Sequence, residues 1–197
     1  MTTPRRILLI EGHPDGSPER LQRALADAYA QGAQAAGHEL RRVQLAALDV
    51  PILRTAQDWH HGTVPPDLKP VQDAMVWADH LVLLFPLWMG DMPALTKGFI
   101  EQVARPGFAV GPEGARPFGH KPLSGRSARV IVTMGMPALV YRWFYRAHSL
   151  KALERNVLGF IGYGPIHETL IGQVDALGEA GAANWLKRLH RLGRRGD

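Results

Sequence analysis

Residues 5–25 read RRILLIEGHPDGSPERLQRAL, and this stretch decides the fold. The run from Arg6 to Glu11 is almost entirely apolar, as expected of a parallel strand that is covered on both faces. It ends in a turn rich in glycine and proline, residues 12–18. An amphipathic helical stripe follows, which consists of Leu21, Leu25, Ala28 and Tyr29. Gly37 ends this helix. The stretch is therefore a strand, a loop and an amphipathic helix.

Four further segments have the character of strands: residues 39–44, 80–85, 128–133 and 166–171. The segments at 80–85 and 128–133 are as apolar as residues 6–11, whereas those at 39–44 and 166–171 are more polar and belong toward the edges of a sheet. Pro93 opens a second amphipathic helix, and a third stripe runs from Ala182 to Leu189. The alternation predicts an α/β fold, a doubly wound five-stranded parallel sheet in the order 2-1-3-4-5, which is the flavodoxin-like arrangement.

The composition is that of one globular domain, residues 1–197, with 46% apolar and 21% charged residues. No apolar run approaches the roughly 20 residues needed to cross a bilayer, and no signal pattern is seen, so we expect a cytoplasmic protein without stable membrane insertion. Cysteine is absent, which excludes disulfides, thiolate nucleophiles and cysteine-ligated metals. Redox chemistry would therefore belong to a bound cofactor.

The net charge is +5 and the pI about 9.9, so acidic partners have to be considered. The basic residues cluster only in residues 186–195, LKRLHRLGRR. We interpret this cluster as the polar face and frayed end of a final helix, and we expect no nucleic-acid partner.

Two long irregular stretches, residues 45–69 and 105–127, interrupt the pattern. Loops of this length in a compact domain are commonly lids, cofactor walls or partner surfaces. The first contains His60 and His61, which would point apart on a regular element and have no carboxylate companion. We interpret them as plain loop residues and expect no metal site.

Ligands of such sheets bind beyond the carboxyl ends of the strands, which selects three loops: residues 12–18, 86–93 and 134–137. In the first, Ser17 is placed to cap a helix that starts at Pro18. Together with His13 and Arg20, the helix start makes a phosphate cradle plausible, but a capped helix beside a surface histidine is an equal alternative. The glycine spacing matches neither a dinucleotide-binding Rossmann motif nor a P-loop.

The second loop, FPLWMGDMPALTKGF at residues 85–99, combines an X-Pro start, a large aromatic residue, a glycine and a proline that begins a helix. Such a loop offers backbone N–H groups and apolar surface to a flat heteroaromatic ring. Taken alone, Trp88 and Met89 fit ordinary packing better than a cofactor contact.

Residues 13–21, the FPLWMGDMPALTKGF segment and VTMGMP at residues 132–137 together resemble the flavodoxin-like NAD(P)H:quinone oxidoreductases. That family includes quinone reductases, modulator-of-drug-activity proteins and ancillary subunits of glutathione-gated potassium efflux systems. The resemblance spans most of the chain, and its middle segment is the most specific.

The resemblance implies a flavin site at the strand ends. It assigns the phosphate end to His13, Ser17, Arg20 and Leu21, one ring edge to Pro86, Leu87, Trp88, Met89 and Gly90, and the other side to Thr133, Met134 and Gly135. Tyr141 and His148 lie near the positions of the family's substrate contacts. For Tyr141, Trp143, Phe144 and Tyr145, an aromatic surface against a partner subunit is an equal alternative.

The implied activity is flavin-dependent reduction of a quinone or related acceptor by NADPH or NADH, with ping-pong kinetics, in a homodimer. Ser17 is the only hydroxyl in its loop, which favours the pyrophosphate of FAD over the phosphate monoester of FMN. A rival function is that of an ancillary regulatory flavoprotein bound to a membrane ion-efflux system. An electron-transfer flavodoxin fits less well because the chain is basic.

Overall fold

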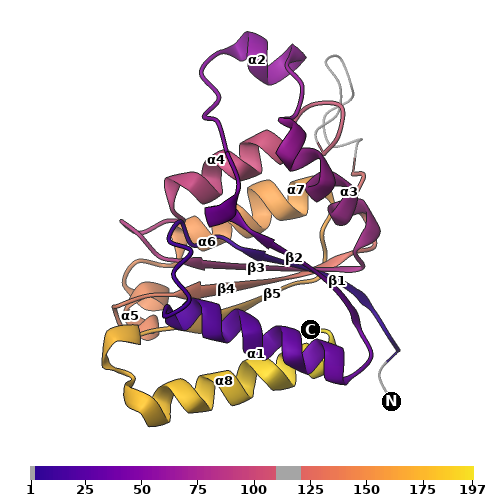
Figure 1. Ribbon diagram of the computed structural model, residues 1–197. Helices are drawn as coiled ribbons and strands as arrows, with labels where there is room; N and C mark the ends of the chain where they lie inside the picture. Colours follow the sequence, from indigo (N-terminus) through magenta and orange to yellow (C-terminus); the bar gives the residue numbers. More distant parts are fainter. Residues whose placement is uncertain (1–2, 110–120) are drawn as a thin grey trace.

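The computed structural model describes residues 3–109 and 121–197, and its five strands form one parallel sheet in the order β2-β1-β3-β4-β5 (Figure 1). Every pair of neighbouring strands is parallel, and β2 and β5 lie at the edges. The predicted fold class and strand order are confirmed. The strands are β1 (Arg6–Glu11), β2 (Glu39–Gln44), β3 (His80–Pro86), β4 (Ser127–Thr133) and β5 (Ile166–Ile171).

Helices lie on both faces of the sheet, with α1 and α8 on one side and α3, α4 and α7 on the other (Figure 1). Their bounds are α1 (Leu21–Ala35), α2 (Ala56–His61), α3 (Lys69–Trp77), α4 (Ala94–Val103), α5 (Ala138–Trp143), α6 (His148–Ala152), α7 (Gly159–Ile161) and α8 (Gly178–Arg195), with short 3₁₀ turns η1 (Leu45–Ala47), η2 (Pro66–Leu68) and η4 (Val174–Ala176) and a π-helical segment η3 (Leu153–Leu158). Among the described residues, no helix has both the length and the apolar character to cross a membrane.

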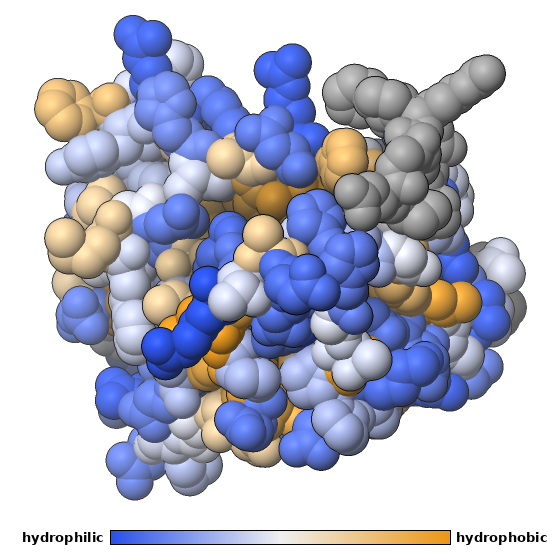
Figure 2. Space-filling model, turned by 90° about the horizontal axis from the view of Figure 1, so that it is seen from above, coloured by the Kyte–Doolittle hydropathy of each residue, from blue (hydrophilic) through white to orange (hydrophobic). Residues whose placement is uncertain are grey.

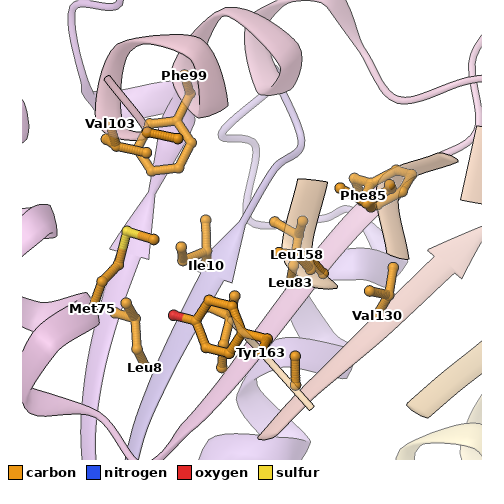
Figure 3. Close-up of a cluster of buried hydrophobic side chains, with 14 of the residues drawn as sticks. Leu8, Ile10, Met75, Leu83, Phe85, Phe99, Val103, Val130, Leu158 and Tyr163 are labelled. Atoms are coloured by element: carbon orange, nitrogen blue, oxygen red, sulfur yellow. The ribbon is translucent and has the colours of Figure 1, made fainter. Parts of the chain in front are cut away.

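The sheet separates two apolar cores. The larger core lies under α3 and α4, where Met75, Phe99 and Val103 face strand residues such as Ile10 and Leu83 (Figure 3). All seven residues of β3 and all seven of β4 are buried, as expected of central strands covered on both faces. Seen from outside, the layer over this core is mostly hydrophilic, with hydrophobic residues visible in hollows between polar ones (Figure 2).

The second core lies under α1 and α8, whose backbones approach each other unusually closely. A Cβ atom on Gly32 would lie 2.0 Å from the carbonyl oxygen of His190, and one on Gly193 would lie 2.0 Å from that of Tyr29. Since only glycine fits at both points, the two helices are in direct backbone contact.

The start of α1 differs from the prediction. The helix begins at Leu21 with Arg20 as N-cap and no side-chain cap, so Ser17 does not cap it. The reason is Asp15, whose carboxylate accepts hydrogen bonds from the Ser17 N–H (2.9 Å) and from Arg20 Nε (2.7 Å) and holds residues 15–20 in a turn. At the other end, Gly37 closes the helix with φ +80°, as predicted.

The first long stretch is more ordered than the sequence indicated. Thr55 caps α2 by accepting the N–H of Asp58, and the buried Arg105 donates to the Asp58 carbonyl oxygen at 2.6 Å. His60 and His61 lie exposed at the end of α2. Residues 110–120 of the second long stretch lie outside the described residues.

The basic tail is not a frayed end. Helix α8 runs to Arg195, and the N–H groups of Gly196 and Asp197 close it by donating to the carbonyls of Gly193 and Leu192. Arg129 also holds the Asp197 side chain at 2.8 Å. The cluster is therefore part of an ordered helix.

Candidate functional site

A cavity of about 300 Å³ opens at the carboxyl ends of β1, β3 and β4. Nine predicted site residues line it: His13, Arg20, Leu21, Pro86, Leu87, Trp88, Thr133, Met134 and Gly135. Three residues that the sequence did not single out complete it: Gln22, Val174 and Asp175. The three loops selected from the sequence thus meet at one cavity.

The loop after β1 forms a polar wall. The N–H of Asp15 donates to Nδ1 of His13 at 3.0 Å, so a neutral His13 carries its proton on Nε2. Burial lowers the pKa of His13, against the opposing charge of Asp15. The imidazole ring meets the ring of Trp88 edge-on at 5.7 Å. His13 is therefore a neutral hydrogen-bond donor at neutral pH, with its ring fixed by two contacts.

Arg20 brings a positive charge to this wall. Its guanidinium lies 2.6 Å from the Asp15 carboxylate, and the side chain is about half exposed. Hydrogen bonds from the Ser17 N–H and from Arg20 hold the pKa of Asp15 below its usual range. Ser17 itself lines a separate small pocket of about 20 Å³ beside the cavity.

Gln22 joins the polar wall to the sheet. Its side-chain amide donates to the carbonyl oxygen of Leu84 at 3.0 Å and accepts the hydroxyl of Thr133 at 3.1 Å. In the sequence, Gln22 stands out only as a polar residue on the apolar face of the helix that also carries Leu25 and Tyr29. A buried amide with two partners fixes the first turn of α1 against the end of β4.

The loop after β3 forms the apolar wall. The N–H of Leu87 donates to the Thr133 carbonyl at 2.7 Å, and Trp88 pairs with Asp91 through two backbone hydrogen bonds of 2.8 and 3.0 Å. Met89 and Gly90 form the tip between them, with φ +48° and +84°. The tip points away from the cavity: Met89 is fully exposed, and neither it nor Gly90 lines the cavity.

The third wall consists of Thr133, Met134 and Gly135 together with the loop after β5. The N–H of Val174 donates to the Met134 carbonyl at 3.1 Å, which places the next residue, Asp175, against Gly135. A Cβ atom on Gly135 would lie 3.2 Å from the Asp175 carboxylate. The sequence did not indicate this loop because β5 has the pattern of a polar edge strand, although its carboxyl end adjoins that of β4.

The structure does not bring Tyr141 and His148 to the cavity. Tyr141 is 2% exposed, and its hydroxyl contacts Ser149 Oγ at 2.8 Å and the N–H of Leu150 at 3.3 Å. Ser149 in turn donates to the Gly90 carbonyl at 2.6 Å. His148 is exposed at the start of α6. Tyr141 thus supports the tip of the loop after β3 from behind.

Five large apolar side chains are exposed on and just after α5, and we call them the α5 patch: Leu139, Val140, Trp143, Phe144 and Tyr145. Trp143 and Phe144 are more than three-quarters exposed, at 76% and 77%. Clustered exposure of this kind marks interaction surfaces on soluble proteins.

The donor set of the cavity fits a flavin. One wall supplies Nε2–H of His13, the Arg20 guanidinium and the backbone N–H groups of Leu21 and Gln22, which lie at the start of α1 without an intrahelical acceptor and attract anions. The other walls supply Leu87, Trp88 and Met134 as apolar surface for a flat ring. Within residues 3–109 and 121–197, no three His, Asp or Glu side chains are grouped to hold a metal ion.

Comparison with known proteins agrees with the fold and this geometry. Residues 5–192 match a family model described as flavodoxin-like fold. The chain belongs to the flavodoxin-like fold family. The family expected from the sequence is thereby confirmed.

Relatives of this flavodoxin-like chain include an uncharacterized NAD(P)H oxidoreductase of Haemophilus influenzae, 27% identical over 86% of this chain and 85% of that protein. The glutathione-regulated potassium-efflux system ancillary protein KefG of Shigella dysenteriae is 27% identical over 73% of this chain and 65% of that protein. A solved structure from Klebsiella pneumoniae, provisionally named a quinone reductase, has a TM-score of 0.81 at 26% identity and covers 95% of this chain and 83% of that chain.

Proposed function

We propose that the protein is a flavin-dependent NAD(P)H oxidoreductase that reduces quinones or related acceptors. One observation carries the proposal: a single cavity at the strand ends has an anion-attracting wall on one side and an apolar wall on the other. A flavin has these two parts, a phosphorylated tail and a flat ring. The names of the Haemophilus and Klebsiella proteins support the same assignment.

In this proposal, the first loop holds the phosphate. His13 donates its Nε2 proton, Arg20 provides charge, and the N–H groups of Leu21 and Gln22 point to the anion from the helix start. The charge of Arg20 is partly neutralised by Asp15, so the backbone donors contribute a large share of the binding.

The ring would lie along Leu87 and Trp88, over Thr133 and Met134. A flavin held by these residues would supply hydride transfer from NAD(P)H and two-electron reduction of a quinone to the quinol, with the two substrates bound in turn in a ping-pong sequence. No side chain has to act as a nucleophile. The protein positions the reactants, and half-exposed Trp88 leaves one side open for nicotinamide and acceptor in turn.

We propose FMN as the flavin, in place of the FAD that the loop sequence favoured. A volume of about 300 Å³ is at the low end for ligand pockets and suits the smaller flavin, which lacks the adenylate half. The small pocket lined by Ser17 is too narrow to take that half.

We also propose that the α5 patch is the contact surface of a homodimer. Phe144 and Tyr145 pack edge to face at 5.0 Å, so the surface offers a preformed aromatic anchor. Ser149 couples the same region to Gly90, and a partner on the patch would cover the apolar wall of the cavity.

The test is flavin content. We expect purified protein to show flavin absorbance, to release FMN on denaturation, and to oxidise NADPH or NADH in the presence of a soluble benzoquinone. Arg20→Ala should weaken flavin retention about tenfold, the loss of one charge-assisted contact. Ser17→Ala, in the same loop but outside the cavity, should change it far less. A protein that binds neither FMN nor FAD contradicts the proposal.

The likeness to KefG favours a second candidate, an ancillary flavoprotein that binds a membrane ion-efflux system. In that case, deleting the protein should change potassium efflux in cells, and the flavoprotein should co-purify with the transporter. Normal efflux after deletion would leave the oxidoreductase as the sole candidate.

A further inference from the structure

The outward face of α8 carries only positively charged side chains over its last three turns. Five cationic side chains lie on that face, and all are exposed: Lys187, Arg188, Arg191, Arg194 and Arg195. Their spacing of three and four residues keeps them on one side of the helix, while Leu189 and Leu192 point into the core against α1. We call these five residues the α8 basic face.

Acidic side chains barely neutralise this face. Among the ion pairs of the described residues, only Arg195 of the five contacts a carboxylate, that of Asp197 at 3.9 Å. On the neighbouring α1, Asp27 is already paired with Arg42 and Arg23. The exposed residues of α1, Gln31, Gln34 and Ala35, are neutral. The field of the α8 basic face is therefore directed outward.

The face has no apolar anchor. No large hydrophobic side chain of α1 or α8 is among the strongly exposed ones, although α5 has several. Trp185 is half-buried beneath the guanidinium of Arg188, 4.8 Å from its ring. Hollows of about 400 and 560 Å³ flank the row of cations, and the second is lined by Ala24, Ala28 and Leu186 together with the carboxylate of Asp27.

We propose that the α8 basic face binds the surface of an anionic phospholipid bilayer. Specific protein interfaces usually centre on buried aromatic or aliphatic anchors and are depleted in lysine, and this face has the opposite composition. Sequence-specific nucleic-acid recognition by a helix requires that it enter a groove and present hydrogen-bonding side chains to the base edges, but α8 is packed against α1, with backbone contacts at Gly32 and Gly193. A row of cations on a broad helical layer matches a flat array of lipid phosphates, which attract lysine and arginine electrostatically.

In this arrangement the helix adsorbs and does not insert, because its apolar side is occupied by α1. The flavin cavity stays accessible because it opens at the carboxyl ends of the strands, near the start of α8, whereas the cations lie in the C-terminal half of α8. The inference uses none of the cavity residues and does not depend on the proposed oxidoreductase activity.

Vesicle flotation tests the proposal with full-length protein. We expect binding to vesicles of phosphatidylcholine with about one quarter phosphatidylglycerol, no binding to phosphatidylcholine alone, and release at about 0.5 M salt, where charges are screened beyond roughly 4 Å. Because one cation near an anionic surface contributes about a fivefold effect, Lys187→Gln with Arg191→Gln should lower the partition coefficient about 25-fold.

The matched control is Lys151→Gln with Arg155→Gln, also an exposed lysine and arginine four residues apart on a helical segment, on the opposite face of the sheet. It makes the same change in net charge and should leave binding within twofold of the unmodified protein. An equal fall of the partition coefficient in both double variants would show that net charge alone governs vesicle binding, and would overturn the proposal. So would a lack of binding to anionic vesicles, or tighter binding to a DNA duplex than to vesicles at the same salt.

Discussion

Gln22→Met tests whether the buried amide at the start of α1 stabilises the cavity. Methionine keeps the length of the side chain but removes the donor to the Leu84 carbonyl and the acceptor of the Thr133 hydroxyl. Each net hydrogen bond contributes about 1 kcal/mol, so we expect a loss of about 2 kcal/mol in the free energy of unfolding. A larger penalty is not expected, because the Leu84 carbonyl still accepts the N–H of Gly12 at 2.6 Å.

A double-mutant cycle isolates the contact between Gln22 and Thr133. Thr133→Val alone removes the same hydrogen bond and leaves the glutamine oxygen without its buried donor, again at about 1–2 kcal/mol. In the double variant that bond is lost only once and neither partner is stranded. We therefore expect the double variant to lose about 1–2 kcal/mol less than the sum of the single variants.

The assay is urea unfolding of flavin-free protein, followed by tryptophan fluorescence. Gln31→Met, an exposed glutamine on the same helix, is the control and should cost less than about 0.5 kcal/mol. Additive single effects, or a Gln22→Met variant as stable as the control, would refute the reasoning. Flavin affinity measured on the same variants should fall with Gln22→Met, since the first turn of α1 then loses its attachment to β4.

Three further predictions concern other parts of the molecule. Burial lowers the pKa of His80 to about 3, so the unfolded chain takes up a proton at this histidine at a higher pH than the folded chain does. The free energy of unfolding should therefore fall by about 2 kcal/mol from about pH 7 to about pH 5. In urea unfolding, His80→Gln should make the free energy of unfolding less dependent on pH over that range. If the proposed homodimer forms through the α5 patch, Trp143→Asp should convert it to monomer in light scattering, whereas Val76→Asp, also a change at an exposed apolar residue, should leave it a dimer. A monomeric unmodified protein would contradict the proposed dimer. Gly32→Ala should lower the free energy of unfolding by about 3 kcal/mol, because the added methyl group would collide with the carbonyl of His190 in α8. A melting temperature equal to that of the unmodified protein would contradict this prediction.

The sheet could be predicted because buried parallel strands have an unmistakable pattern. The runs at residues 6–11, 80–85 and 128–133 are continuous and apolar, and the observed strands start and end within one residue of them. Strand order then determined which loops lie together at the carboxyl edge. The resemblance to the flavodoxin-like oxidoreductases then named most of the residues at that edge that line the cavity.

What the sequence did not indicate depends on contacts between distant residues. The start of α1 moved to Leu21 because the Asp15 carboxylate competes for the N–H of Ser17, a local choice that cap preferences alone do not resolve. The segments between β4 and β5 were missed because α5 has its large apolar residues on the outside, which obscures the helical stripe. Tyr141 looked like a substrate contact by position, but its hydroxyl is turned toward Ser149.

The glycine contact between α1 and α8 has a consequence for the evolution of the site. Both helices lead away from the cavity: α1 starts at its polar wall, and α8 follows the loop that carries Asp175. They meet at Gly32, about 15 Å along α1 from Gln22. Any residue larger than glycine there would spread the two walls apart without touching a ligand. In the proposed oxidoreductase, the range of acceptors that fit would thus change from outside the cavity, while every residue that lines it stayed the same.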